Sequence, residues 1–167
     1  IPGHVWEGEY SNRLPLIRSI LAFNPFSEGW ALYGEQIADE LGAYDDFTVG
    51  RLGYLQSLAF RACRMVVDTG LHSKGWTEEE AWEYFTENAA VTDQQARSEI
   101  QRYIVMPGQA TAYKIGMIKI LELREHAREE LGDDFDIKAF HDTVLGGGAL
   151  PLEILERRVN TWIEDVK

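Results

Sequence analysis

The sequence predicts an all-α fold, built as a single multi-helix domain of about seven to eight helices. Apolar residues recur at helical spacing along most of the 167 residues. Glycine, proline and Ser/Thr/Asp signals separate these segments, and no convincing stretch alternates apolar and polar residues as a strand does. The length fits one domain, and there is no repeat or linker that would divide residues 1–167. The expected helices cover about 4–21, 27–41, 47–71, 77–88, 92–105, 109–131, 136–144 and 151–166.

Turn and cap residues set the boundaries in the first part of the chain. Pro15 should kink or end the first helix, because proline cannot donate a helical hydrogen bond. Asn24 and Pro25 are expected to form a loop. Ser27 then caps the second helix, and Gly42 is a natural stop for it.

Later boundaries have equally clear signals. Thr77 followed by Glu80 forms a capping box, in which each side chain accepts a hydrogen bond from the other residue's backbone. Thr92 and Asp136 are further N-cap residues, and Gly132 is a C-terminal stop. Pro151 fits the first turn of the last helix.

Composition and charge exclude several classes of function. The formal net charge of −12 argues against a nucleic-acid or anionic-membrane partner, because either would need a concentrated basic surface. Cys63 is the only cysteine, so a metal would need His, Asp or Glu ligands. No run of 18 apolar residues is present, and the N-terminus lacks a signal-peptide pattern. Cytoplasmic and periplasmic locations both remain open, as does the oligomeric state.

A histidine and a glutamate on consecutive helices form a candidate metal site. His4 precedes Glu28 by 24 residues, and gluzincin zinc sites combine helix-borne histidines, a glutamate from a following helix and an open water position. Glu35 lies seven residues after Glu28, close to the same helical face. The alternative is that Glu28 favours the positive helix N-terminus, while Glu35 and His4 are solvated.

The third helix carries a polar stripe. Arg64, Asp68 and His72 follow one another at intervals of four residues, and Arg61 lies nearby. One interpretation is an Arg64–Asp68 ion pair with an exposed histidine. The other is a buried cluster in which Asp68 orients a neighbour, so that His72 binds substrate or stabilises developing negative charge.

Polar residues also converge around the break at Pro107-Gly108. Arg102 and Tyr103 precede it, and Gln109, Tyr113 and Lys114 follow it. A tyrosine hydroxyl could donate to an oxyanion, and Arg102 could hold a carboxylate. Alternatively, the tyrosines belong to the core or its rim. His126 and His141 are expected on the surface or in packing, and the 146–148 glycine run lacks the lysine of a phosphate-binding loop.

Five segments of the chain closely resemble a bacterial family catalogued as domain of unknown function 885, whose members are expected to be metallopeptidases. These segments cover nearly all of the sequence and occur in the family's order. They are IPGH, SEGWALYGEQIADELGAYDD, RACRMVVDTGLHSKGWTEEEA, RYIVMPGQATAYKIG and FDIKAFHDTVLGGGALPLEIL.

The resemblance implies a role for the first residues. The family's diagnostic element looks like HExxPGH, followed by an EGWALY-type segment. Ile1 takes the second x, and Pro2, Gly3 and His4 complete the motif. The leading His and Glu, the expected first zinc ligand and general base, would precede Ile1. The chain is therefore expected to be the C-terminal helical part of a larger gluzincin-like metallopeptidase, inactive without its N-terminal portion.

The resulting hypothesis is zinc-dependent hydrolysis of peptide bonds by the parent protein. The alternatives are a non-catalytic helical or interaction module that completes a site only with the N-terminal portion, and a metal-dependent hydrolase of another amide or ester. The expected partners are a peptide substrate and that N-terminal portion, and the expected cofactor is zinc. The expected residues are His4 and Glu28 for the metal, His72, Tyr103 and Tyr113 for catalysis, and Arg64, Arg102, Gln109 and Lys114 for substrate binding.

Overall fold

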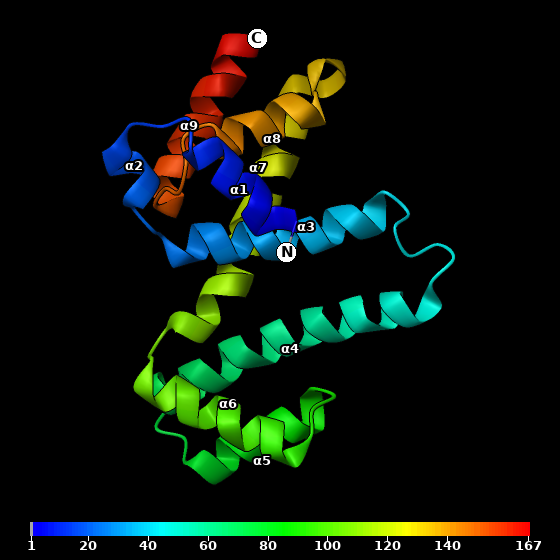
Figure 1. The fold of residues 1–167 in the computed structure, drawn as a ribbon, viewed down its shortest axis with the longest axis vertical. Coiled ribbons are helices and arrows are strands. Elements are labelled where there is room, and N and C mark those ends of the chain that lie inside the picture. The colour runs from blue at the N-terminus through cyan, green and yellow to red at the C-terminus, as the bar shows by residue number, and fades with distance from the viewer. Residues whose placement is uncertain (1) are drawn as a thin grey trace. The chain divides into compact units, whose positions relative to one another are not determined.

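The computed structural model describes residues 2–167, with side chains from Gly3 onward, and it confirms the all-α prediction (Figure 1). The motif position assigned to Ile1 lies outside these residues. The described chain contains nine α-helices and one short 3₁₀ helix, Gly132–Asp134. The α-helices are α1 Pro2–Ser11, α2 Leu16–Ile20, α3 Asn24–Glu40, α4 Thr48–Ser73, α5 Glu78–Asn88, α6 Asp93–Val105, α7 Gln109–Leu131, α8 Ile137–Leu145 and α9 Leu152–Val166.

Most of the expected caps are present. The Thr77 hydroxyl accepts a hydrogen bond from the Glu80 amide at 3.2 Å, and the Glu80 carboxylate accepts one from the Thr77 amide at 2.8 Å. The side chains of Thr92 and Asp136 accept amide hydrogen bonds at the starts of α6 and α8. Gly42 has φ of +77°, a conformation that glycine adopts easily, so it ends α3 as expected.

Of two expectations near the start of the chain, one is confirmed and one needs correction. The first helix ends at Ser11, before Pro15, and α2 begins directly after that proline. The expected loop at Asn24-Pro25 is wrong, because α3 begins at Asn24. Pro25 is tolerated there because the first amides of a helix have no helical partner. Ser27 therefore lies inside α3, and its hydroxyl donates to the Glu7 carboxylate instead of capping.

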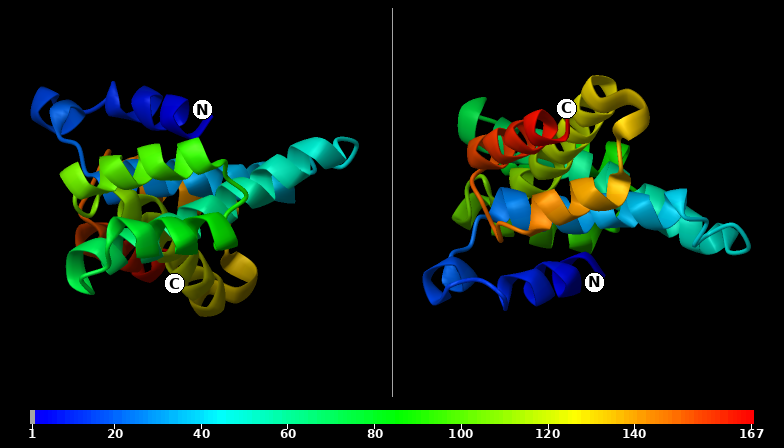
Figure 2. Two further views of the ribbon diagram at one scale, coloured as in Figure 1. Left: turned by 90° about the horizontal axis from the view of Figure 1, so that it is seen from below. Right: turned by 90° about the horizontal axis from the view of Figure 1, so that it is seen from above.

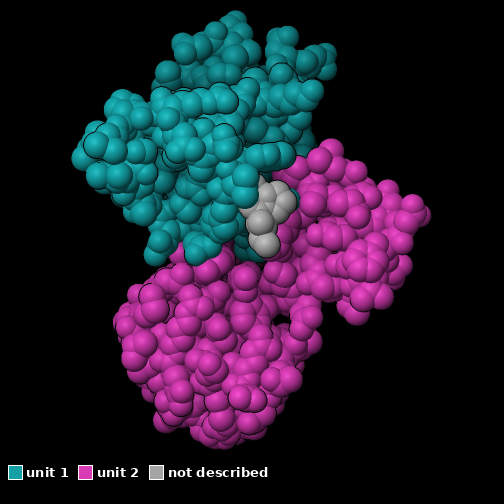
Figure 3. Space-filling model, viewed as in Figure 1, with its two compact units in different colours: residues 1–34, 115–167 teal, residues 35–114 magenta. Residues whose placement is uncertain are grey.

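The chain divides into two compact units (Figure 3). Unit 1 contains Ile1–Gly34 and Ile115–Lys167, and unit 2 contains Glu35–Lys114. Helices α3 and α7 each contribute residues to both units. Within the described residues, no helix is both long and apolar enough to span a lipid bilayer.

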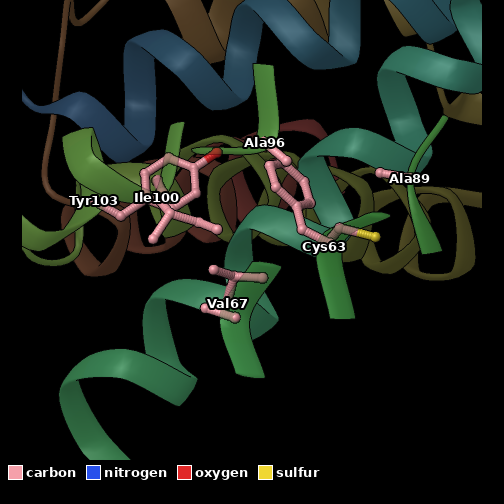
Figure 4. Close-up of a cluster of buried hydrophobic side chains, with 9 residues drawn as sticks. Cys63, Val67, Ala89, Ala96, Ile100 and Tyr103 are labelled. Carbon is pink, nitrogen blue, oxygen red and sulfur yellow. The ribbon is translucent and has the colours of Figure 1, made fainter. Parts of the chain in front are cut away.

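Unit 2 is organised around α4, with α5 and α6 packed against it (Figure 1). Their facing side chains, with the first residues of α7, form an apolar core (Figure 4). Burial of this core supplies the main driving force for folding the unit. The core contains Cys63, Val67, Ala81, Phe85, Ala89, Ala96, Ile100, Tyr103 and Ala110. Because Cys63 is buried, the pKa of its thiol is raised.

Unit 1 depends on a very close contact between α3 and α7. A Cβ atom added to Gly29 would lie 2.4 Å from the Gly116 backbone, and one added to Gly116 would lie 1.7 Å from the Pro25 carbonyl oxygen. Only glycine permits this approach. Helix α9 lies beside the later part of α7 (Figure 2), where Lys119 and Glu156 are 3.7 Å apart.

Candidate functional site

The predicted metal ligands lie side by side in unit 1. His4, in the first turn of α1, places Nε2 3.4 Å from Glu28 Oε2 on α3. The histidine side chain is 49% exposed and the glutamate 21%, so both groups remain accessible to a ligand. Two ligands of one tetrahedral zinc ion, each bonded at about 2.0–2.2 Å, are separated by about 3.4 Å. The pair therefore has the spacing and the donor chemistry that zinc requires.

Glu7 extends this pair, although the sequence analysis did not single it out. Its Oε2 lies 3.7 Å from His4 Nδ1, one helical turn away on α1. Its other oxygen accepts the hydrogen bond from Ser27. A carboxylate beside the second ring nitrogen orients a metal-binding histidine and favours its reactive tautomer. The i, i+3 spacing of His4 and Glu7 on a helix is the sequence signal that could have identified it.

Local packing explains why His4 and Glu28 meet. Gly3 allows α1 to approach α3 closely, because a Cβ atom there would lie 2.8 Å from the Ala31 Cα atom. The buried Trp30 indole donates a 3.0 Å hydrogen bond to the Gly3 carbonyl oxygen. The Pro-Gly-His and Glu-Gly-Trp segments thus fix one another, and α1 runs from Pro2 without interruption.

The described residues do not form a complete metal site by themselves. Nowhere in residues 2–167 do three or more His, Cys, Asp or Glu side chains gather closely enough to hold an ion. A structural or catalytic zinc ion needs at least three protein ligands. His4 and Glu28 alone are therefore too few ligands for zinc, and a metal ion held by this pair would need further protein groups.

A hollow of about 390 Å³ lies along the same helices of unit 1. The His141 ring forms part of its wall, contacts Trp30 edge-on and shares a 2.8 Å hydrogen bond with the Tyr33 hydroxyl. His141 therefore packs against Trp30 and Tyr33, and one edge of its ring borders the hollow. The hollow is lined by Trp6, Tyr10, Trp30, Lys138, His141, Asp142 and Leu145. A larger hollow of about 520 Å³ between α8 and α9 contains none of the predicted site residues.

Three of the four predicted substrate-binding residues come together in unit 2. The amide oxygen of Gln109 accepts hydrogen bonds from Arg64 at 3.4 Å and from Arg102 at 3.2 Å. Glu99 lies 3.7 Å from each of the two arginines. Lys114 is partly buried, at the end of the unit 2 part of α7.

Tyr113 and Arg61 complete this polar cluster. The guanidinium groups of Arg61 and Arg64 lie 4.8 and 4.5 Å from the centre of the Tyr113 ring, within the range of cation–π attraction. The Nε atoms of both arginines are buried and have no hydrogen-bond partner among the described residues. Burial and the neighbouring charge of Arg64 lower the pKa of the Arg61 guanidinium.

The other two predicted catalytic residues, His72 and Tyr103, already form hydrogen bonds within the protein. His72 Nε2 lies 3.0 Å from the backbone carbonyl oxygen of Tyr103, so that nitrogen donates to it. The Tyr103 hydroxyl donates to Glu99 at 2.6 Å, and the side chain is 1% exposed. Burial and this hydrogen bond raise the pKa of Tyr103 far above its usual value. Of the two predicted tyrosines, Tyr113 is thus better placed to meet a ligand.

Asp68 has a different role from the one expected. Its two carboxylate oxygens each lie 3.1 Å from the Gly108 amide, which donates to them. Neither the Arg64–Asp68 ion pair nor an Asp68–His72 contact occurs, because the side chain points to the turn before α7. Gly108 has φ of +80°, so Asp68 stabilises a turn that glycine makes possible. This turn sets the position of Gln109.

The chain matches the family model "Bacterial protein of unknown function (DUF885)" over residues 1–159. Among solved structures, it is similar to a "putative lipoprotein from Colwellia psychrerythraea", with 49% identity and a TM-score of 0.94 over 98% of this chain. It is also similar to a "putative lipoprotein of unknown function from Shewanella oneidensis", with 31% identity and a TM-score of 0.87 over 94% of this chain. The chain spans 28% and 29% of the lengths of those proteins. No curated protein matches it. The chain therefore belongs to the DUF885 family of bacterial proteins.

Proposed function

We propose that the protein containing this chain is a zinc-dependent hydrolase of peptide bonds, with His4 and Glu28 as two of its metal ligands. The observation that carries the proposal is the 3.4 Å separation of His4 Nε2 and Glu28 Oε2. This distance is long for a hydrogen bond but matches two ligands of one tetrahedral ion. The expected remaining protein groups are the His and Glu that precede Ile1 in the resembled motif.

The chain's own residues have distinct tasks in this proposal. His4 donates Nε2 to the metal, and Glu7 holds the histidine ring from its other side. Glu28 supplies a negatively charged oxygen ligand. Bound zinc would lower the pKa of a coordinated water and polarise the carbonyl that the water attacks. The hollow lined by Trp6, Tyr10 and Trp30 would accept an apolar or aromatic side chain of a peptide.

The roles of His72 and Tyr113 in stabilising the transition state remain predictions, as does the role of Lys114 in substrate binding. These residues belong to unit 2, whereas the metal ligands belong to unit 1. The competing hypothesis is a non-catalytic helical module. It would explain the His4–Glu28 contact as a weak interaction between helices, worth about 0–1 kcal/mol.

A zinc titration of the intact protein tests the proposal. Glu28→Gln should weaken zinc binding by more than about 100-fold, because losing a ligand costs more than losing an outer-shell partner. Glu7→Gln should weaken it about 10-fold through the orientation of His4. Glu35→Gln, on the same helix, is the matched control and should leave the affinity nearly unchanged. Binding is measured by competition with a chromogenic chelator.

A peptide-library digestion then tests the substrate class. Zinc-dependent cleavage of peptides that disappears in Glu28→Gln supports the proposal. If the intact protein binds no zinc, or if Glu28→Gln and Glu35→Gln behave alike, the metal assignment is wrong. If zinc binds but esters are hydrolysed and peptides are not, only the peptide assignment is wrong.

A further inference from the structure

The polar cluster of unit 2 has more cationic groups than its own acids neutralise. Arg64 and Arg102 share Glu99, which lies 3.7 Å from each. Arg61 has no hydrogen bond or ion pair with any described residue, and its guanidinium rests on the Phe60 and Tyr113 rings. Glu35 and Glu99 favour the charged form of Arg61, but burial and the charge of Arg64 have larger effects in the opposite direction and lower its pKa.

We propose that Arg61, Arg64 and Arg102 form a carboxylate-binding site in unit 2, and that the Gln109 amide oxygen occupies the position of the ligand. This inference does not depend on zinc binding in unit 1. It adds Arg61 to the residues predicted from the sequence. It also changes the role of Gln109 from a direct ligand to a group that the carboxylate displaces.

The hydrogen bonds of Gln109 indicate how the exchange would occur. Its oxygen receives N–H groups from Arg64 at 3.4 Å and Arg102 at 3.2 Å. In a bond between arginine and a carboxylate both partners are charged, and such bonds are shorter, about 2.7–2.9 Å. A carboxylate oxygen in the same place would therefore replace two long bonds by two shorter ones.

Two guanidinium nitrogen atoms of the cluster are buried without a hydrogen bond to the described residues, which favours binding of an additional anion. Arg64 is only 2% exposed, and its Nε has no hydrogen-bond partner among the described residues, with Glu99 Oε2 3.7 Å away. Arg61 Nε is also buried without a hydrogen-bond partner in this part of the chain. Leaving a buried donor unsatisfied is costly, particularly on a charged group. Arg102 has a 41% exposed side chain, so the cluster is open to solvent on that side.

Arg97, also in unit 2, is an arginine whose charge is neutralised by neighbouring acids and therefore serves as a comparison. It is 48% exposed, lies 3.6 Å from Glu79 and 3.5 Å from Asp93, and stacks on Trp82 at 4.7 Å. Its charge is matched by two acids on the surface. The arginines around Gln109 differ in burial and in neutralisation, and both differences favour an additional anion.

A carboxylate fits this cluster better than a phosphate does. A carboxylate is planar, with a single negative charge, and it matches both the shape of the amide that it replaces and the fork of a guanidinium. A doubly charged phosphate would meet stronger repulsion from Glu99. The carboxylate could come from the C-terminus of a peptide or from a small free acid, and the test distinguishes these sources.

Calorimetric titration of the intact, metal-free protein tests the inference with four probes. The probes are acetyl-tetra-alanine with a free C-terminus, the same peptide as its amide, succinate, and inorganic phosphate. The free peptide should bind at least 10-fold more tightly than its amide, or succinate should bind at least 10-fold more tightly than phosphate. The first result identifies a peptide terminus as the source, and the second identifies a small acid. If phosphate is the tightest ligand, or if no carboxylate binds, the inference is wrong.

Variants assign the site to these residues. Arg61→Gln and the more exposed Arg102→Gln should each weaken carboxylate binding at least 10-fold, whereas the control Arg97→Gln should leave it unchanged. Gln109→Ala should maintain or strengthen binding, because it removes the competing oxygen. Equal losses in Arg97→Gln and Arg61→Gln would overturn the assignment, as would a loss in Gln109→Ala as large as that in Arg102→Gln. Thermal melting confirms that each variant is folded.

Discussion

The two units hold their polar residues in opposite ways. In unit 1, His4 and Glu28 remain accessible, and close backbone contacts at Gly3, Gly29 and Gly116 set the helices that carry them. In unit 2, Arg64 and Asp68 are almost completely buried among aromatic and apolar side chains. Exposed charges in unit 1 lose little solvation free energy, because water still solvates them. Burying the charges of unit 2 costs solvation free energy, which hydrogen bonds or a bound ligand must offset.

This difference shows which part of each site is sensitive to mutation. In unit 1, the supporting glycines should matter for folding, while the polar pair should matter mainly for metal binding. In unit 2, the polar residues themselves should affect folding. Substitutions in the two units can therefore test the comparison through protein stability alone, without an assay of activity.

The largest effect is expected for Gly116→Ala in unit 1. The new methyl group would lie 1.7 Å from the Pro25 carbonyl oxygen, so α3 and α7 would have to move apart. We expect a loss of about 3 kcal/mol or more in the free energy of unfolding. The control is Gly8→Ala in α1, where nothing lies within 4 Å of the added atom. It should stabilise the protein by about 0.5–1 kcal/mol, as measured by urea denaturation. Similar losses in both variants would show that the close contact is not what supports unit 1.

Asp68→Ala should have the next largest effect. It removes the only acceptor found for the Gly108 amide within the described residues, and this hydrogen bond is to a charged group that is only 3% exposed. The expected loss is about 2 kcal/mol. Glu79→Ala, in which the removed carboxylate is 61% exposed, is the control and should cost less than about 1 kcal/mol. If the two acids were equally dispensable, the comparison between buried and exposed charges would fail.

The capping box at the start of α5 should have a smaller effect. Thr77→Ala is expected to cost about 1 kcal/mol, because the Glu80 amide loses its acceptor. Hydrogen bonds from Thr77 lower the pKa of Glu80 in the folded protein. The contribution of Glu80 is therefore fully present above its unfolded-state pKa and is lost as the pH falls through the lower, folded-state pKa. The melting temperatures of the wild type and Glu80→Gln should differ at pH 7 and converge at strongly acidic pH. A constant difference would contradict this.

The smallest effect is expected for Arg61→Met. The methionine retains much of the contact with Phe60 and Tyr113 and removes a partly buried charge that has no ion pair in the described chain. Loss of the cation–π contacts and relief of desolvation oppose one another. We expect an unchanged or slightly higher melting temperature, by calorimetry, although carboxylate binding should be weakened as in Arg61→Gln. A large loss of stability would identify Arg61 as a structural residue.

Periodicity and caps made most of the helices predictable. Thr77, Thr92 and Asp136 act locally, within three residues of the amides that they accept, so the sequence alone specifies these helix starts. The start of α3 was not predictable in this way. Ser27 donates to Glu7, which lies 20 residues earlier, and this tertiary contact replaced the expected local cap.

The candidate sites were only partly predictable. The pairing of His4 with Glu28 was predicted from the sequence, and the two side chains do lie side by side. Arg64, Arg102 and Gln109 also lie together, while their role in substrate binding stays a prediction. Glu7 and Arg61 were not predicted as site residues, because an acid near a histidine and an arginine on a helix are common in exposed positions. Their partners, or the lack of them, became evident only when the helices were packed.

By itself, the sequence determined the all-α class, nearly all helix boundaries and the residues that can carry chemistry, because these depend on short-range periodicity and hydrogen bonding. Only the tertiary structure decided which polar groups meet. It turned Asp68 toward the Gly108 amide, left the Nε atoms of Arg61 and Arg64 without a hydrogen bond to any described residue, and brought His4 to within 3.4 Å of Glu28. The physical reason is that such contacts depend on how the helices pack, and in unit 1 the close packing depends on Gly3, Gly29 and Gly116, which are far apart in the chain.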